Sequence, residues 1–196
     1  MPRRDLTEER TAQILDAFEK CIVQYGLKGS SLERVAEEAG VKRSILRHYI
    51  GNREALISAM VEGLVEKYRR QLEALVSCLP ATNRAQKLLE WLFSPSSSGV
   101  GEESVIFGKL IIEAGKFPKI QALLSQSMEE FIQTVATQLK LAFPHASRKK
   151  CWTAASGIVA LYSNYEALAP LQLPDTHRKA AYECARRLIA TLESEQ

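Results

Sequence analysis

The chain has 196 residues, of which 46% are hydrophobic and 25% charged, with 26 lysines and arginines against 23 aspartates and glutamates. This composition is ordinary for a folded domain, so it excludes wholesale disorder and the collagen-like and proline-rich classes. The net charge of +3 is too small by itself to indicate an anionic partner, so the distribution of charge along the chain must decide.

Apolar residues recur at three- and four-residue spacing along nearly the whole chain, which predicts helices and no strands. Gly26, Gly40, Pro80 and Pro118 divide this pattern into blocks. The predicted helices cover about residues 7–25, the stretch between Ser31 and Gly40, 42–49, 53–78, 82–93, 102–115, 118–142, 146–169 and 175–193. A low-complexity loop is expected over Ser94–Gly101.

The fold class predicted from this pattern is all-α, with about nine helices in two domains. We expect residues 1–52 to form a three-helix head of the helix-turn-helix type and residues 53–196 to form a six-helix body, to which the family resemblance described below assigns ligand binding and dimerisation. The long fourth helix joins the head to the body.

Two short helices separated by a glycine turn indicate the helix-turn-helix. The first offers a small apolar inner face, made by Val35, Ala36 and Ala39. Gly40 supplies the left-handed turn conformation without steric cost. The second helix is then buried through Val41, either Ile45 or Leu46, and Ile50.

The outer face of the second short helix is basic. It carries Lys42, Arg43, Ser44, Arg47 and His48. Residues 41–53 contain four lysines and arginines and no acidic residue, which exceeds the net charge of the whole chain. A solvated basic face that binds nothing is the alternative, but the turn in front of this cluster favours a recognition helix in the major groove of DNA.

Residues 7–60 resemble the head of TetR-family transcriptional repressors. The matching segments are Arg10-Thr-Ala-Gln-Ile-Leu-Asp-Ala-Phe, Ser31-Leu-Glu-Arg-Val-Ala-Glu-Glu-Ala-Gly-Val41 and Ile45-Leu-Arg-His-Tyr-Ile-Gly-Asn-Arg-Glu-Ala-Leu-Ile57. The resemblance implies an all-α homodimer whose heads move when a ligand occupies the body. It also implies dimerisation through the last two helices, about 146–169 and 175–193.

The same resemblance implies the residues that contact DNA. They are Ser31, Lys42, Arg43, Ser44, Arg47, His48, Tyr49 and Arg53. Ser44 replaces the usual glycine and Arg47 the usual tyrosine, so the operator of this chain is expected to differ from those of relatives. A second arginine in the groove favours guanine.

The segment Lys109-Leu-Ile-Ile-Glu-Ala-Gly-Lys-Phe-Pro118 is similar to a corner between two body helices in multidrug-efflux repressors. This similarity implies a small, largely apolar organic effector. Pockets for such ligands are mainly apolar with a few polar groups. The residues predicted to line the pocket are Leu64, Tyr68, Trp91, Phe107, Leu110, Glu113, Met128, Phe131, Tyr162 and Tyr165. Core packing is the alternative for the aromatic residues, and Glu113 is otherwise exposed or paired.

Other kinds of site have little support in the sequence. The three histidines are isolated and have no cysteine or carboxylate at ligand spacing, so we expect no metal and no cofactor. The sequence also lacks the motifs of a catalytic nucleophile or a phosphate-binding loop, so we do not expect an enzyme. Four scattered cysteines, Cys21, Cys78, Cys151 and Cys184, are expected as buried thiols in a reducing compartment. With no apolar run long enough for a membrane helix and no signal-peptide core, the protein is expected in the cytoplasm, on the nucleoid.

The leading hypothesis is therefore a DNA-binding repressor that a small ligand releases from a palindromic operator. Two alternatives stay open: a regulator or activator of the same fold without an effector, and an all-α ligand-binding protein whose basic helix is incidental.

Overall fold

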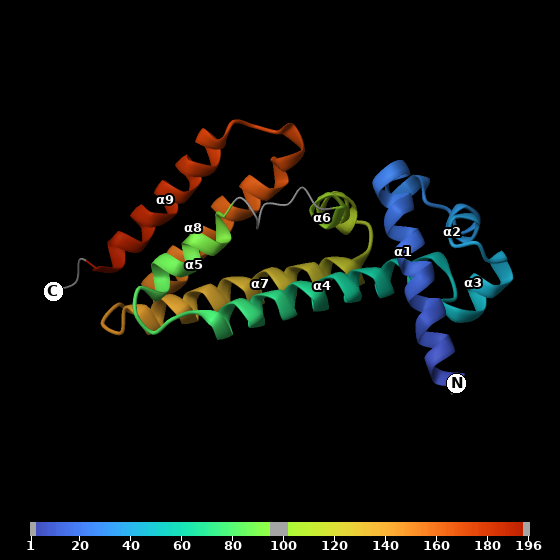
Figure 1. The fold of residues 1–196 in the computed structure, drawn as a ribbon, viewed down its shortest axis with the longest axis horizontal. Helices are drawn as coiled ribbons and strands as arrows, with labels where there is room; N and C mark the ends of the chain where they lie inside the picture. The colour runs from blue at the N-terminus through green and yellow to red at the C-terminus, as the bar shows by residue number, and fades with distance from the viewer. Residues whose placement is uncertain (1–2, 95–101, 194–196) are drawn as a thin grey trace. The chain divides into compact units, whose positions relative to one another are not determined.

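The computed structural model describes residues 3–94 and 102–193, and in these residues it shows nine α-helices and no strand (Figure 1). The all-α prediction is confirmed. The loop expected over 94–101 falls, apart from Ser94, outside the described residues. The helices are α1 (Arg3–Gly29), α2 (Leu32–Glu38), α3 (Arg43–Tyr49), α4 (Arg53–Cys78), α5 (Arg84–Leu92), α6 (Glu102–Ala114), α7 (Pro118–Ala142), α8 (Arg148–Ala167) and α9 (Asp175–Glu193).

Local signals explain where the helices begin and end. The Asn52 side-chain oxygen accepts a hydrogen bond from the Ala55 amide at 2.8 Å, which caps the start of α4. Pro118 is the first residue of α7, where its missing N–H costs nothing. Inside the segment assigned to α1, Gly26 has φ 71° and breaks the helical backbone, so only a short turn continues to Gly29.

The described chain falls into two compact units. The first unit is Met1–Lys67 with Glu102–Leu124, and the second is Tyr68–Gly101 with Ser125–Gln196. Helices α4 and α7 each have residues in both units. The head and body boundary expected between residues 52 and 53 stays a prediction.

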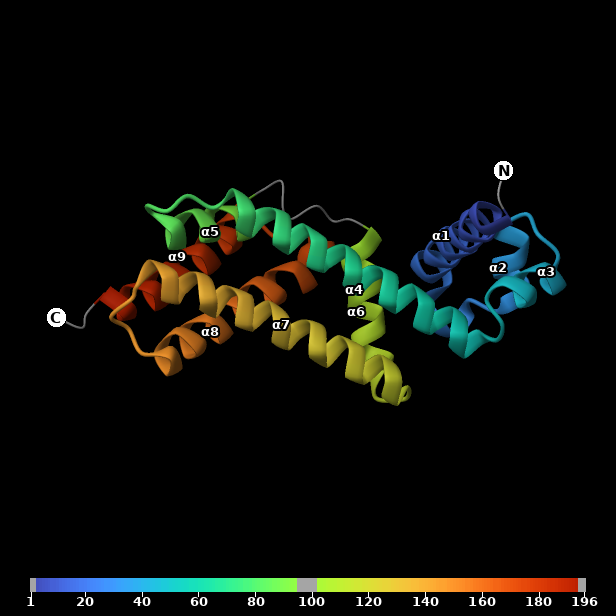
Figure 2. The same cartoon turned by 90° about the horizontal axis from the view of Figure 1, so that it is seen from below.

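In the first unit, α1 contacts α2, α3 and α6 (Figure 2). Ile14, Phe18 and Ile22 lie on one side of α1 at four-residue spacing and are fully buried. Burying three large apolar side chains along one helix stabilises the packing around it by several kcal/mol, at roughly 1.5–3 kcal/mol per side chain. This core holds α2 and α3 against α1.

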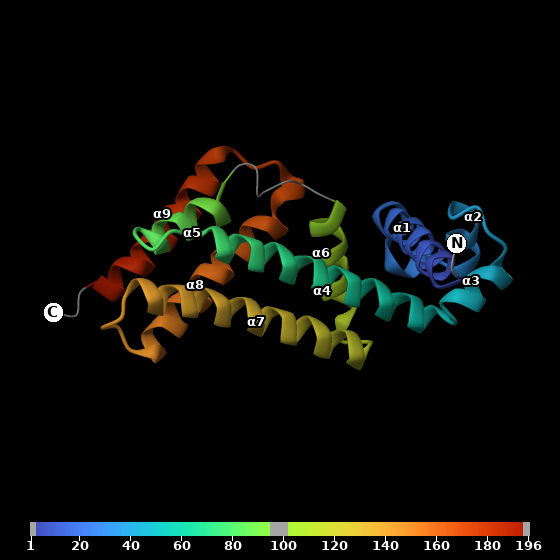
Figure 3. The same cartoon turned by 60° about the horizontal axis from the view of Figure 1, so that its bottom comes forward.

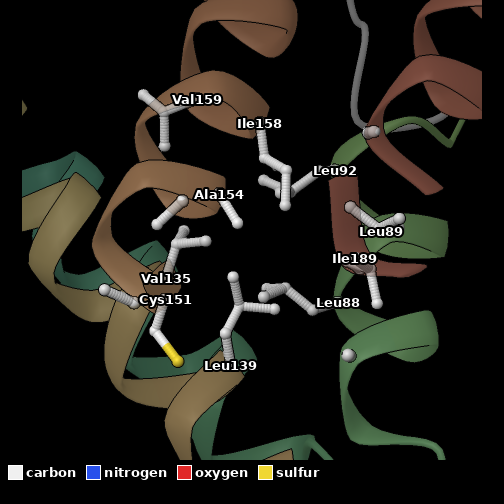
Figure 4. Packing of buried hydrophobic residues seen from close by; sticks show 14 of the residues in the cluster. Leu88, Leu89, Leu92, Val135, Leu139, Cys151, Ala154, Ile158, Val159 and Ile189 are labelled. Atoms are coloured by element: carbon white, nitrogen blue, oxygen red, sulfur yellow. The ribbon is translucent and has the colours of Figure 1, made fainter. Parts of the chain in front are cut away.

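In the second unit, α8 packs against α9, and α5 also contacts α9 (Figure 3). The core draws on α5, α7, α8 and α9, as the side chains of Leu88, Leu139, Ile158 and Ile189 show (Figure 4). At Gly157 a β-carbon would come within 2.8 Å of Leu188 Cδ1. The absence of a side chain at this position therefore lets α9 approach α8 closely.

The expectation for the cysteines is wrong at two positions. Cys21 and Cys151 are buried, whereas Cys78 and Cys184 are exposed. Cys78 ends α4, and Cys184 lies on the solvent side of α9 next to the buried Ala185. A cysteine within a helix that has a periodic apolar pattern therefore does not have to face the core.

Candidate nucleic-acid interface

A tight turn joins α2 and α3. Ser31 caps α2, because its hydroxyl oxygen accepts a hydrogen bond from the Arg34 amide at 3.3 Å. Gly40 then adopts φ 63°, a left-handed conformation that favours glycine. The Val41 amide donates back to the Ala36 carbonyl at 2.9 Å, which closes the turn. The helix-turn-helix geometry predicted from the sequence is present.

The turn is fixed to α1 as well as to its own helices. The Gln13 side chain on α1 donates from Nε2 to the Ala39 carbonyl at 2.8 Å. Val35 and Ala36 form the buried side of α2, and Ala39 is buried at the end of this helix. Small side chains at these positions allow the helices to approach closely, so α3 is held on a rigid support.

Leu46 anchors α3. Its side chain is fully buried, while the side chain of its neighbour Ile45 is 41% exposed. The alternative left open by the sequence is therefore settled in favour of Leu46. Because each residue advances about 100° around a helix, Ser44 and His48 lie opposite Leu46. Ile45 and Arg47 lie on the two flanks of that outer face.

Most residues predicted to contact DNA are accessible. The exposed ones are Ser31, Lys42, Arg43, Ser44, Arg47 and His48. Tyr49 and Arg53 are half-buried. The rings of His48 and Tyr49 meet edge to face, with their centroids 5.1 Å apart. The outer face of α3 thus presents donors to solvent, as a recognition helix requires, although DNA contact by each residue stays a prediction.

Two of these arginines have partners within the protein. The Arg43 guanidinium forms an ion pair with the Glu33 carboxylate on α2. The Arg53 guanidinium donates a hydrogen bond to the Leu27 carbonyl. The pairing of Arg43 with Glu33 has no signature in the sequence, since ten residues and a turn separate the two side chains.

The carbonyls at the end of α1 gather donors from three other helices. From α6, the Lys109 ammonium donates to the carbonyls of Ile22 and Val23 at 2.9 and 2.8 Å. Arg34 on α2 donates to the Gly29 carbonyl. Arg53 on α4 donates to the Leu27 carbonyl. A cation at the C-terminal end of a helix satisfies orphan carbonyls and complements the helix dipole.

The role of Lys109 is not evident from the sequence, where this residue only begins a segment similar to other regulators. In the sequence, nothing distinguishes Lys109 from a lysine that only faces solvent. Its partners Val23 and Ile22 lie 86 and 87 residues earlier in the chain. No local pattern encodes a contact at that separation.

Glu113 is paired in the structure. Its carboxylate contacts Lys116 at 2.7 Å and Lys28 at 3.7 Å. The hydrogen bond from Lys116, and then the positive charges of Lys116 and Lys28, hold the pKa of Glu113 below its ordinary value. Lys28 follows the end of the regular part of α1, so this contact adds to the attachment of α6.

The residues predicted for the effector pocket divide between the two units. Those of the first unit are Leu64, Phe107, Leu110 and Glu113, and those of the second are Tyr68, Trp91, Met128, Phe131, Tyr162 and Tyr165. Leu64 and Leu110 are buried, and Trp91 is 38% exposed. Their joint role as a pocket stays a prediction.

An aromatic group surrounds Tyr162 in the second unit. Its ring centroid lies 6.3 Å from that of Phe93 and 5.7 Å from that of Phe131, both edge to face. Phe93 also meets Tyr182 at 6.3 Å. Burial, with the nearby charge of Glu166, raises the pKa of Tyr162, so its hydroxyl is neutral at physiological pH.

One open hollow of about 350 Å³ lies on the first unit. Residues of α4 line it together with Asn52 and Lys119, and Lys119 forms an ion pair with Glu62 there at 2.9 Å. None of the residues predicted for the effector lines this hollow. Over residues 3–94 and 102–193, no group of histidine, cysteine and carboxylate side chains could hold a metal ion, and no helix could cross a membrane.

Residues 14–60 match the family model described as bacterial regulatory proteins, tetR family. The HTH-type transcriptional regulator BetI of Paraburkholderia xenovorans is 25% identical over 193 residues, which cover 96% of each chain. The HTH-type transcriptional regulator PksA of Bacillus subtilis is 32% identical over 92 residues, 46% of this chain and 45% of PksA.

The fold has solved counterparts. The structure of a TetR-family regulator from Mesorhizobium loti superposes with a TM-score of 0.79 at 14% identity, over 97% of this chain and 98% of the other. At that identity the likeness concerns the fold, whose regular secondary structure in the described residues is all helical.

Proposed function

Since this chain belongs to the TetR family of transcriptional regulators, whose members bind DNA operators, we propose that it is a repressor released from its operator by a small, largely apolar ligand. Regulation of transcription follows from the family. The sign of regulation, the ligand and a palindromic operator are the parts that we propose.

The exposed face of α3 opposite Leu46 supports the contact with DNA. It offers arginine, histidine and serine donors for base edges and phosphates, on a helix that is fixed to α1 and α2. A palindromic operator would match a two-fold symmetric dimer that places two such helices about 34–36 Å apart.

The attachment of α6 to α1 is the observation that carries the ligand response. Lys109 joins α6 to the carbonyls at the end of α1, and α1 supports the turn of the helix-turn-helix through Gln13. A ligand that changes the position of α4 or α6 would thereby change the position of α3. For release, the ligand must bind the DNA-incompetent conformation more tightly than the other.

The aromatic group around Tyr162 supports an apolar ligand with a ring. Edge-to-face contacts with Phe93 and Phe131 would be replaced by similar contacts with the ligand, and the neutral Tyr162 hydroxyl could orient it by one hydrogen bond. The other members proposed for this site in the second unit are Tyr68, Trp91, Met128 and Tyr165.

A DNA duplex enriched by the wild-type protein from a random library provides the test. We expect aromatic apolar compounds from a panel to release this duplex, measured by fluorescence anisotropy. Tyr162→Phe should keep the affinity for DNA and change the dose of compound that releases it. Release at an unchanged dose would remove Tyr162 from the binding site.

A second candidate function is a regulator of the same fold without an effector. The close ring contacts of Tyr162 favour it, because a packed aromatic group contributes to stability without any ligand. In that case no compound in the panel would release the duplex, and Tyr162→Phe would change only the stability of the protein.

A further inference from the structure

Ile45 is the apolar member of the outer face of α3. Its side chain is 41% exposed, and the other exposed side chains of the helix are all polar. Single exposed apolar residues are common on protein surfaces and need no explanation by themselves. Ile45 is distinguished by its position, on the flank of the face formed by Ser44 and His48.

The chemistry of the major groove gives this position a partner. Each base edge there carries hydrogen-bonding groups, and thymine also carries an apolar C5-methyl group. Isoleucine neither donates nor accepts, so covering a polar base edge would remove water without replacing its hydrogen bonds. The thymine methyl is the feature of the groove that an isoleucine side chain matches.

We propose that Ile45 reads a thymine methyl group in each half-site of the operator. This specificity-determining contact rests on the DNA-binding function proposed above and goes beyond it by naming a base. The anchoring of Leu46 fixes the rotation of α3, and the β-branch of isoleucine restricts its own rotamers in a helix. The methyl-binding surface is therefore already in place before DNA binds.

The placement of Arg47 separates this contact from guanine recognition. Arg47 lies on the opposite flank of the outer face, about 200° around the helix from Ile45. The two side chains therefore face different base pairs. A half-site is expected to hold a thymine facing Ile45 and, at another position, the guanine that an arginine prefers.

Replacement of thymine by deoxyuridine tests the proposal, because it removes the methyl group alone. The probe is the duplex that the wild-type protein enriches from a random-sequence library, with each thymine replaced in turn. At one position in each half-site, replacing thymine by deoxyuridine should weaken binding of the wild-type protein about fourfold, which corresponds to burial of one methyl group.

The affinity of the Ile45→Ala variant should not fall when deoxyuridine replaces thymine at that position, since this variant already lacks the contact with the methyl group. Ile45→Val, which keeps the branched carbon, should keep part of the fourfold effect. Ile112→Ala is the matched control: Ile112 is 79% exposed on α6, and this variant should behave as the wild type does.

The proposal would be overturned if, at every thymine, replacement by deoxyuridine lowered the affinity of the wild type and of Ile45→Ala by the same factor, even if both proteins select the same sequence. An unchanged preference for thymine in a library selected with Ile45→Ala would overturn it as well. If the wild type enriches no sequence, DNA binding itself fails and the proposal fails with it. The first two outcomes leave the regulator function standing.

Discussion

Leu46 and Ile45 are adjacent in the chain but differ in exposure, from fully buried to 41% exposed. This difference sets which side of α3 meets solvent and therefore which side chains are available to DNA. Either residue satisfies an apolar periodicity, so the sequence alone left the phase of this short helix open. Packing against α1 and α2 decides it.

The stability of the helix-turn-helix should depend on Leu46 far more than on Ile45. Leu46→Ala removes a fully buried side chain, and we expect it to lower the free energy of unfolding by about 2–5 kcal/mol. Ile45→Ala should change it by less than about 1 kcal/mol. Urea denaturation followed by circular dichroism measures both; similar losses would mean that the phase of α3 is wrong.

Arg47 should contribute to the choice of sequence. If the guanidinium pairs with a base edge, Arg47→Ala is expected to weaken binding to the selected duplex by about 1–3 kcal/mol per half-site, and to relax the preference at one position of each half-site. Arg70→Ala, which removes an exposed arginine further along α4, is the control. Unchanged affinity and preference for Arg47→Ala would show that Arg47 points away from the bases.

At the scale of elements, helix ends with strong local signals were predictable. The predicted ranges 53–78, 118–142 and 175–193 agree with α4, α7 and α9 to the residue. Elsewhere the backbone departs from local expectation. Asn83 is left-handed with φ 54°, so α5 begins two residues late. The predicted helix 146–169 ends early at Ala167, and a 3₁₀ turn forms over Ala169–Leu171.

The site was predictable in the same uneven way. Basic residues of α3 follow from composition and spacing, because neighbours on a helix face are fixed by its period. The ion pair between Arg43 and Glu33 and the contacts of Lys109 depend on how helices pack, and packing partners distant in the chain leave no mark on a local pattern.

Loss of the Lys109 ammonium should loosen the end of α1. Lys109→Met keeps the apolar stem but removes hydrogen bonds to two carbonyls, each worth about 1.5–3 kcal/mol when the donor is charged. We expect faster hydrogen exchange in the last turn of α1 and in α6, with the fold retained. Lys116→Met, which removes an exposed lysine that pairs with Glu113 and makes no contact with the α1 carbonyls, should leave exchange in α1 nearly unchanged.

At the scale of the whole molecule, α8 and α9 each keep an outward stripe of mostly small residues at three- and four-residue spacing. Their buried sides already pack within the chain, as Gly157 and Leu188 show. The exposed residues of these stripes are Thr153, Ala160, Asn164 and Ala167 on α8, and Ala180, Cys184, Arg187 and Thr191 on α9. These stripes are the surface on which a second copy is expected.

A homodimer through α8 and α9 should give twice the 21.9 kDa chain mass in light scattering at micromolar concentration. Ala160→Glu places a charge on the α8 stripe and should shift the mass toward that of one chain, because an unpaired charge is costly inside an interface. Ala122→Glu, at an exposed position of α7, is the control and should leave the mass unchanged. A wild-type monomer would contradict the prediction.

The contact of Lys109 with the end of α1 bears on the exchange of DNA-binding modules between regulators. A graft cut between residues 52 and 53 transfers α1, α2 and α3 to the recipient but leaves α6 of this chain behind. The incoming carbonyls of Ile22 and Val23 then lose their donor unless the recipient happens to supply a lysine at the same place. A transplant that carries Glu102–Leu124 together with Met1–Lys67 keeps the first unit whole, so chimeras of this chain need more junctions than its linear order suggests.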